Sequence, residues 1–178
     1  MRKIVRSMCA ATLVTGPRQV GKTTLLKHAA AADRRYVTLD DALLRELAVR
    51  DPALFLERFP PPLLIDEIQY APQLMPQIKM RVDNQGIQGA YWLTGSQMFH
   101  LMKDVSESLA GRVGIVNLLG LSQAEIAGRP SSPFLPSSEL LARHREAASP
   151  EDLASVFTMI HRGSMPALYS GAVLPDTE

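Results

Sequence analysis

The residues with the clearest chemical potential form one short stretch, Gly16-Pro17-Arg18-Gln19-Val20-Gly21-Lys22-Thr23, followed by Thr24. The spacing fits the pattern G-x-x-x-x-G-K-[ST] without a mismatch. Glycines in such a loop let the backbone wrap a polyphosphate closely, and successive N–H groups with the start of the next helix present partial positive charge to it. The stretch therefore predicts a phosphate loop in which Lys22 reaches the β- and γ-phosphates and the Thr23 hydroxyl ligates Mg²⁺.

Two adjacent carboxylates, Asp66 and Glu67, are the second candidate group. They follow the apolar run 63–65, which is too short for an independent helix and comes after three prolines, as is typical of a buried central strand. At the carboxyl end of a strand beside a phosphate loop, Asp66 is expected to hold Mg²⁺ through its water shell. Glu67 is expected to orient or deprotonate the attacking water. The alternative for both residues is an ordinary strand-to-helix cap.

Hydroxyl groups follow a further apolar run at residues 90–93. Thr94 and Ser96 are expected to lie beside the acidic pair, where either hydroxyl could sense the γ-phosphate or the attacking water. A helix cap by Ser96 explains the same residue, and both interpretations stay open at this point.

The elements that must position these residues alternate along the chain. Apolar runs predict strands at 11–15, 35–39, 63–67, 90–94 and 113–119, and helical patterns predict helices at 24–32, 42–49, 52–59, 72–84 and 97–104. Either Asp40 or Asp41 is expected to cap the helix at 42–49. Strands that alternate with helices predict an α/β fold of three layers, with a parallel five-stranded sheet between helices.

The sequence also predicts a division of the chain into three parts. Residues 1–127 form the expected core, and residues 128–138, with three prolines and four serines, form a linker or mobile loop. Residues 139–178 are expected to be a short helical segment with helices at 139–147 and 150–162, the second capped by Ser149. We interpret this segment as the start of a truncated second region.

Composition limits the classes of function. The 178 residues suffice for one α/β domain, and the net charge of +1 gives no electrostatic argument for a nucleic acid or a membrane. Cys9 is the only cysteine, so an intramolecular disulfide is excluded. Apolar runs stay below the roughly 18 residues that a membrane-spanning helix needs, and the start of the chain is not typical of a signal peptide. A cytoplasmic protein with no membrane partner is expected.

Five short motifs, taken in order, resemble one known family. They are Gly16 to Thr24, Leu39-Asp40, Ile65-Asp66-Glu67-Ile68-Gln69, Leu93-Thr94-Gly95-Ser96 and Ser108-Leu109-Ala110-Gly111-Arg112. The chain resembles the prokaryotic AAA-like ATPases, which often carry a C-terminal nuclease-like domain of unknown function, over residues 10–127. This family belongs to the additional-strand, catalytic-glutamate division of phosphate-loop NTPases.

The resemblance implies roles for several of the matching residues. Residues 16–24 would bind nucleotide, Asp66 and Glu67 would be the Walker B pair, and Ser96 or Thr94 would be the first sensor. Arg112 is similar to an arginine that could act as a finger on the nucleotide of a neighbouring subunit, and a salt bridge at the start of a strand is its alternative. ATP is expected over GTP because of the resemblance and because an Asn-Lys-x-Asp motif is absent from the sequence.

Three functions fit these residues. The first is a Mg²⁺-dependent ATPase that works as a switch or motor element through self-association. The second is a small-molecule or nucleotide kinase, for which Arg129, Arg143 and Arg145 are lid candidates. The third is a nucleotide-gated interaction module whose state controls a DNA or protein partner, with little hydrolysis.

Overall fold

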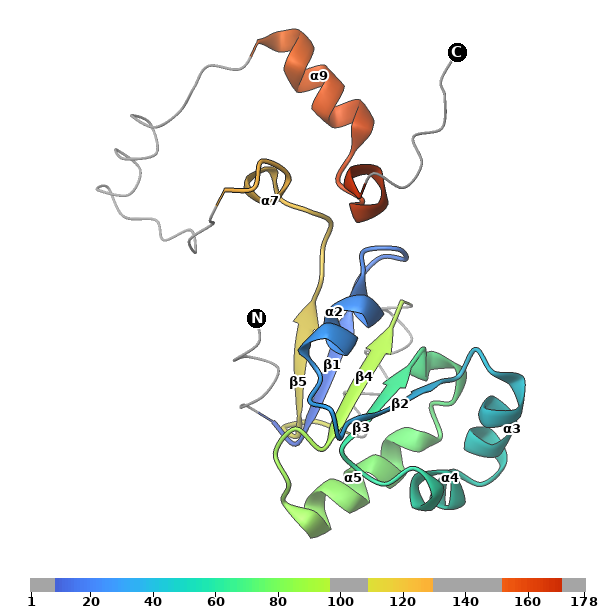
Figure 1. Cartoon of the computed structure of the whole chain (residues 1–178). Helices are drawn as coiled ribbons and strands as arrows, with labels where there is room; N and C mark the ends of the chain where they lie inside the picture. Colours follow the sequence, from blue (N-terminus) through green and yellow to red (C-terminus); the bar gives the residue numbers. More distant parts are fainter. Residues whose placement is uncertain (1–8, 97–108, 130–151, 171–178) are drawn as a thin grey trace. The chain divides into compact units, whose positions relative to one another are not determined.

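The computed structural model describes residues 9–96, 109–129 and 152–170 (Figure 1). The chain forms two compact units, Met1–Leu119 and Gly120–Glu178, which we describe separately. The predicted helices at 97–104 and 139–147 and residues 130–138 of the predicted linker lie outside the described residues.

The first unit is built on a sheet of five strands, all parallel to their neighbours, as the sequence predicted. The order across the sheet is β2-β3-β4-β1-β5, so β4 lies between β1 and β3. Parallel strands bring all their carboxyl ends to one edge, where polar residues from different strands can meet. The strands are β1 (Ala11–Thr15), β2 (Arg35–Thr38), β3 (Leu63–Asp66), β4 (Tyr91–Gly95) and β5 (Val113–Asn117).

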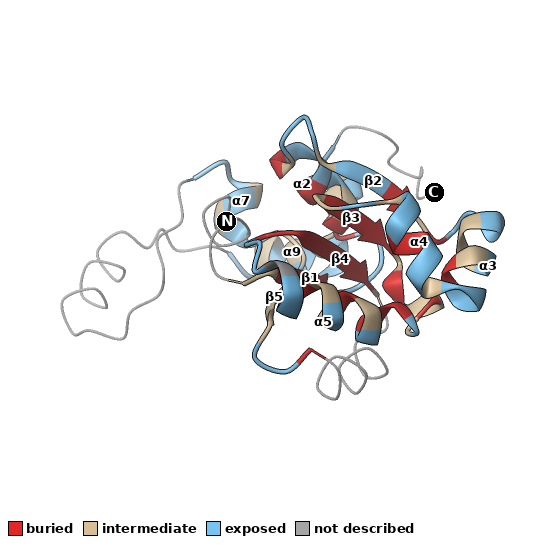
Figure 2. Ribbon diagram, turned by 90° about the horizontal axis from the view of Figure 1, so that it is seen from below, coloured by how far each residue is buried: buried red, intermediate tan, exposed pale blue. Residues whose placement is uncertain are grey.

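Helices cover both faces of this sheet because successive residues in each central strand point to opposite sides. On one face Val14, Leu64 and Trp92 pack with Leu26 of α2 (Lys22–Ala29). The other face contributes to the larger cluster of buried residues, with side chains from α3 (Ala42–Arg50), α4 (Pro52–Arg58) and α5 (Leu74–Gln85). Figure 2 shows α2 and α5 on opposite sides of the buried strands. The result is the expected three-layer α/β arrangement.

Aspartates and glycines set the ends of the covering helices. The Asp41 carboxylate accepts hydrogen bonds from the backbone N–H groups of Leu43 and Leu44 at the start of α3. Asp51 ends α3 and caps α4, and Gly86 ends α5 in the left-handed conformation that glycine adopts most readily. Asp41 is therefore the residue that caps α3, and Asp40, the other candidate, does not cap this helix.

The described residues of the second unit form three short elements: α7 (Gln123–Ile126), α9 (Leu153–Arg162) and the 3₁₀ turn η2 (Pro166–Tyr169). The capping box at Ser122 and Glu125 forms with both of its reciprocal bonds. Within the described part of the chain α9 begins at Leu153, and Asp152 caps it, whereas the sequence placed the cap at Ser149, outside the described residues. No helix in the described ranges has both the length and the apolar character needed to cross a membrane.

Candidate nucleotide site

The loop between β1 and α2 is held in a conformation that requires glycine. Gly16 and Gly21 have φ angles of 142° and 87°, and Gln19 is left-handed at 65°. A Cβ atom on Gly16 would lie 2.0 Å from the backbone carbonyl oxygen of Leu118, which no side chain could tolerate. The loop therefore passes against the residue that follows β5 and leads directly into the first turn of α2, where backbone N–H groups favour an anion.

Lys22, the first residue of α2, is folded back onto this loop. Its Nζ donates to the carbonyl oxygens of Gly16 at 3.0 Å and Pro17 at 2.7 Å, and only 6% of the residue is exposed. Burial lowers the pKa of Lys22, while the charges of Glu67 and Asp66 oppose that shift. A lysine held in this way presents a cation at the floor of the loop, which is the place that a phosphate would occupy.

Asp66 joins the loop to the sheet. The Thr23 hydroxyl donates to Asp66 Oδ1 at 2.8 Å, although 43 positions separate the two residues in the chain. The Thr94 hydroxyl donates to the same oxygen from β4. The structure therefore brings together the threonine and the aspartate for which the sequence predicted a shared metal ion.

Tyr36 is a contact that the sequence analysis missed. Its hydroxyl donates to Asp66 Oδ2 at 2.9 Å, and the ammonium group of Lys27 lies 3.5 Å from the centre of its ring. Burial and the hydrogen bond to Asp66 raise the pKa of Tyr36 to about 12. Only the pairing of β2 with β3, in which Thr38 lies opposite Asp66, places this tyrosine near the carboxylate. A strand pattern read alone does not contain that information.

Glu67 lies at the point where β3 turns into the 3₁₀ segment η1 (Ile68–Tyr70). Its φ angle is 58°, an uncommon left-handed conformation for a residue other than glycine, and its N–H donates to Thr94 Oγ1 at 3.1 Å. The Glu67 carboxylate accepts hydrogen bonds at Oε2 from Ser96 Oγ, at 3.2 Å, and from Gln69 Nε2. Ser96 thus lies beside the glutamate, as the sequence predicted, and Gln69 is a further contact.

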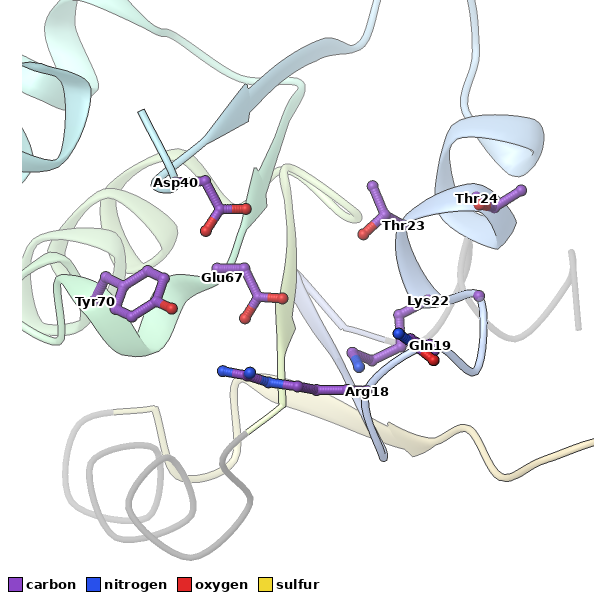
Figure 3. Close-up of a pocket in the computed structure, with 9 residues that line it drawn as sticks. Arg18, Gln19, Lys22, Thr23, Thr24, Asp40, Glu67 and Tyr70 are labelled. Carbon is purple, nitrogen blue, oxygen red and sulfur yellow. The ribbon is translucent and has the colours of Figure 1, made fainter. Parts of the chain in front are cut away.

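The loop, the start of α2 and Glu67 border a cavity of about 510 Å³. Figure 3 shows the loop side chains on one side and those that follow β2 and β3 on the other, with Glu67 extending toward the loop. Asp40 and Tyr70 also line the cavity, although neither was predicted from the sequence to have a role at a site. The lining residues are Arg18, Gln19, Gly21, Lys22, Thr23, Thr24, Asp40, Glu67 and Tyr70.

Arg112 is a predicted site residue that lies away from this cavity and from the residues that contact its lining. It precedes β5, whose first residue Val113 pairs with Ala11 at the start of β1, so it lies at the opposite edge of the sheet. Its guanidinium forms an ion pair with Asp83 of α5. That hydrogen bond lowers the pKa of Asp83 and raises the pKa of Arg112. The salt-bridge interpretation of Arg112 therefore describes its position within its own chain.

The oxygen atoms near Thr23 fit Mg²⁺ bound together with phosphates. The Thr23 hydroxyl and the Asp66 carboxylate are hard oxygen ligands, which Mg²⁺ prefers. Across the described ranges no group of three His, Cys, Asp or Glu side chains could hold a metal ion by itself. Mg²⁺ typically takes one or two protein ligands and completes its shell with water and substrate phosphates, so this sparse donor set suits it.

The parallel sheet with β4 between β1 and β3, and the loop-bordered cavity at its carboxyl edge, define a phosphate-loop NTPase fold. A known family described as an AAA domain matches residues 10–127. The chain belongs to this AAA domain family, which agrees with the resemblance that its motifs carry.

Two relatives with sequence similarity are the uncharacterized proteins Mb2031c of Mycobacterium bovis and Rv2008c of Mycobacterium tuberculosis. Each is 34% identical over 114 residues, which is 64% of this chain and 26% of the relative. The match thus spans about a quarter of the length of these relatives. Among solved structures, AMPPCP-bound DnaA from Aquifex aeolicus is similar with a TM-score of 0.52 and 13% identity, over 93% of this chain and 54% of that chain. At that identity the likeness shows the fold alone.

Proposed function

We propose that this chain binds ATP with Mg²⁺ at residues 16–24 and hydrolyses it. The observation that carries the proposal is the 2.8 Å hydrogen bond between Thr23 and Asp66, because it joins the anion-binding loop to the strand that bears the carboxylates. Lys22 would donate to the β- and γ-phosphates once it leaves the loop carbonyls. Mg²⁺, held by Thr23 and through water by Asp66, would supply charge neutralisation at the phosphate oxygens.

Glu67 is the proposed general base. Its carboxylate lines the cavity and faces the loop, so it can take a proton from a water molecule that attacks the γ-phosphorus. The new bond forms between the water oxygen and phosphorus while the bond to the bridging β,γ-oxygen breaks, which leaves ADP and phosphate. Ser96, whose hydroxyl donates to the same carboxylate, is the proposed residue that orients that water or the γ-phosphate.

The test measures ATP binding and phosphate release for the parent, Lys22→Ala and Glu67→Gln. We expect Lys22→Ala to weaken binding at least about 100-fold, since a buried cation that contacts two phosphates is lost. Glu67→Gln should bind ATP as the parent does and release phosphate about 100 to 10,000 times more slowly, as loss of a general base requires. Tight binding by Lys22→Ala, or normal turnover by Glu67→Gln, would contradict the proposal.

The proposal also extends to the role of the whole protein. We propose a cytoplasmic switch or motor role that involves self-association and a DNA or protein partner. Phosphate release that requires a small-molecule acceptor would favour a kinase instead. Nucleotide binding without phosphate release at every protein concentration would favour a gated interaction module.

A further inference from the structure

The side chain of Gln69 holds the Glu67 carboxylate from the side of η1. Its Nε2 donates to Glu67 Oε2 and also lies 3.4 Å from Ser96 Oγ, which donates to the same Oε2. Both of these hydrogen bonds therefore fall on one oxygen of the carboxylate. Two donors from different elements fix the rotation of a carboxylate better than one donor does, and they leave Oε1 as the oxygen that can accept from a further group.

The local structure has two energetically unfavourable features at this contact. The Oε1 atom of Gln69 is buried and has no hydrogen-bond partner among the described residues. Rotation of the amide by 180° would turn its carbonyl oxygen toward the carboxylate of Glu67, so only the observed orientation gives attraction. In addition, Glu67 itself has the left-handed φ angle of 58°. Unsatisfied buried groups and unusual backbone angles cluster at functional sites, where the arrangement serves the mechanism.

We propose that Gln69 is a positioning residue, which fixes the Glu67 carboxylate so that Oε1 faces the attacking water. The inference rests on the proposed hydrolysis of ATP and deepens it. Gln69 does not line the cavity, whereas Glu67 does, so Gln69 acts through the glutamate and not on the nucleotide. A general base works only within hydrogen-bond reach of the proton it removes, and a carboxylate free to rotate spends less time in that geometry.

The kinetic test compares Gln69→Leu with Gln73→Leu. Leucine removes the amide donor at similar size, and Gln73 is an exposed residue whose side chain caps no helix, so it is a matched control. We expect Gln69→Leu to lower kcat about 10- to 100-fold with KM for ATP within about twofold, because ground-state binding does not use this contact. The loss should be smaller than in Glu67→Gln, since Ser96 still holds Oε2. Gln73→Leu should match the parent.

A second readout needs neither turnover nor nucleotide. In the NMR spectrum of the nucleotide-free protein, Glu67→Gln should shift the side-chain amide resonance of Gln69, because its charged acceptor is replaced by a neutral amide. The resonance of Gln73 should stay in place. An unchanged Gln69 resonance would show that the contact with Glu67 does not form in solution, whatever the kinetic result.

The outcomes separate this inference from the proposed function. A parent that hydrolyses ATP while Gln69→Leu keeps its full kcat contradicts only the positioning role. An equal rise in KM and fall in kcat/KM, with kcat unchanged, would assign Gln69 to substrate binding and also overturn it. A parent that releases no phosphate under any condition overturns the proposed hydrolysis and, with it, the role of Gln69.

Discussion

The Asp66 carboxylate accepts hydrogen bonds from the hydroxyl groups of residues in three separate elements. Thr23 comes from α2, Thr94 from β4 and Tyr36 from β2. A carboxylate held by several donors has little freedom to rotate, and a metal ligand benefits from such support because its geometry is fixed before the metal binds. The orientation of the Asp66 side chain therefore depends on how β2 and β4 pair with β3.

The Tyr36 hydroxyl allows a direct test of this support. Tyr36→Phe keeps the ring beneath Lys27 and removes the hydrogen bond to Asp66, so we expect a loss of about 1 kcal/mol in the free energy of unfolding at neutral pH. Because folding raises the pKa of Tyr36 from 10.0 to about 12, the stabilisation is fully present below pH 10 and is lost as the pH rises toward 12.

Urea unfolding of the parent and Tyr36→Phe across this pH range makes the measurement. The difference between the two proteins isolates the hydroxyl from other groups that titrate there. We expect the difference to shrink from pH 10 upward. A difference that stays constant or grows would show that the Asp66 contact does not form in solution.

At the residue scale, the site residues that could be predicted from the sequence are those that belong to a continuous motif. The loop residues 16–24 and the Asp66-Glu67 pair were found because their spacing along the chain carries the signal. Tyr36 was missed because only the pairing of β2 with β3 brings it near the carboxylate, and Asp40, two residues after β2, was missed because its place depends on the same pairing. Gln69 was quoted within a motif, but its contact with Glu67 depends on the left-handed turn between them.

At the element scale, the junction of β1, the loop and α2 is the most constrained part of the site. Gly16 passes against the Leu118 carbonyl, and Leu118 in turn donates its N–H to the Thr15 carbonyl oxygen at 2.8 Å. The loop is thus tied to the residue after β5 as well as to its own strand. Its shape depends on β5 being paired with β1.

Gly16→Ala should be costly for this reason, and Gly86→Ala is its matched control. Both positions have positive φ angles, but a Cβ on Gly86 would meet no atom within 4 Å. We expect Gly86→Ala to cost about 1–2 kcal/mol, from the left-handed backbone alone. Gly16→Ala should cost about 3 kcal/mol or more, because the Leu118 backbone must also move.

Chemical denaturation of both variants measures these costs, and calorimetry with ATP gives the second readout. Gly16→Ala should also weaken ATP binding, whereas Gly86→Ala should leave it unchanged. Equal costs for the two substitutions would mean that the loop does not pass against Leu118.

The elements themselves were largely predictable. Each predicted strand is present within two residues of its expected ends. The apolar runs were clearest for β1, β3 and β4, which are buried along their whole length, whereas β2 and β5 are partly exposed. The short turn η1 was not predicted, since Ile68–Tyr70 carries no helical period and its start depends on the conformation of Glu67. That turn sets the place of Gln69, so the missed element and the missed contact have one cause.

At the scale of the whole molecule, the parallel sheet separates two groups of charged residues. Strands of five residues span about 16 Å, so Arg112 at one edge cannot reach the cavity at the other edge of the same chain. A finger role for Arg112 is therefore possible only on the nucleotide of a neighbouring subunit. It would also require Arg112 to leave its ion pair with the exposed Asp83.

The concentration dependence of turnover tests that role. If Arg112 acts in trans, phosphate release per subunit should rise with protein concentration in the parent and stay flat in Arg112→Ala. Lys79→Ala, a change of charge on the same helix as Asp83, serves as the control and should follow the parent. A parent rate that is already flat across concentrations would contradict the finger role and leave Arg112 as a salt-bridge residue.

The most direct test of the whole account is the gain in ATP affinity that Mg²⁺ brings, measured by calorimetry for the parent, Thr23→Val, Asp66→Asn and the double variant. We predict that Mg²⁺ raises the affinity of the parent at least about tenfold, equivalent to about 1.4 kcal/mol. Each single substitution should remove this gain, and the double variant should lose no more than either one, because both residues serve the same ion. A folded Asp66→Asn variant that keeps the full gain would contradict the account.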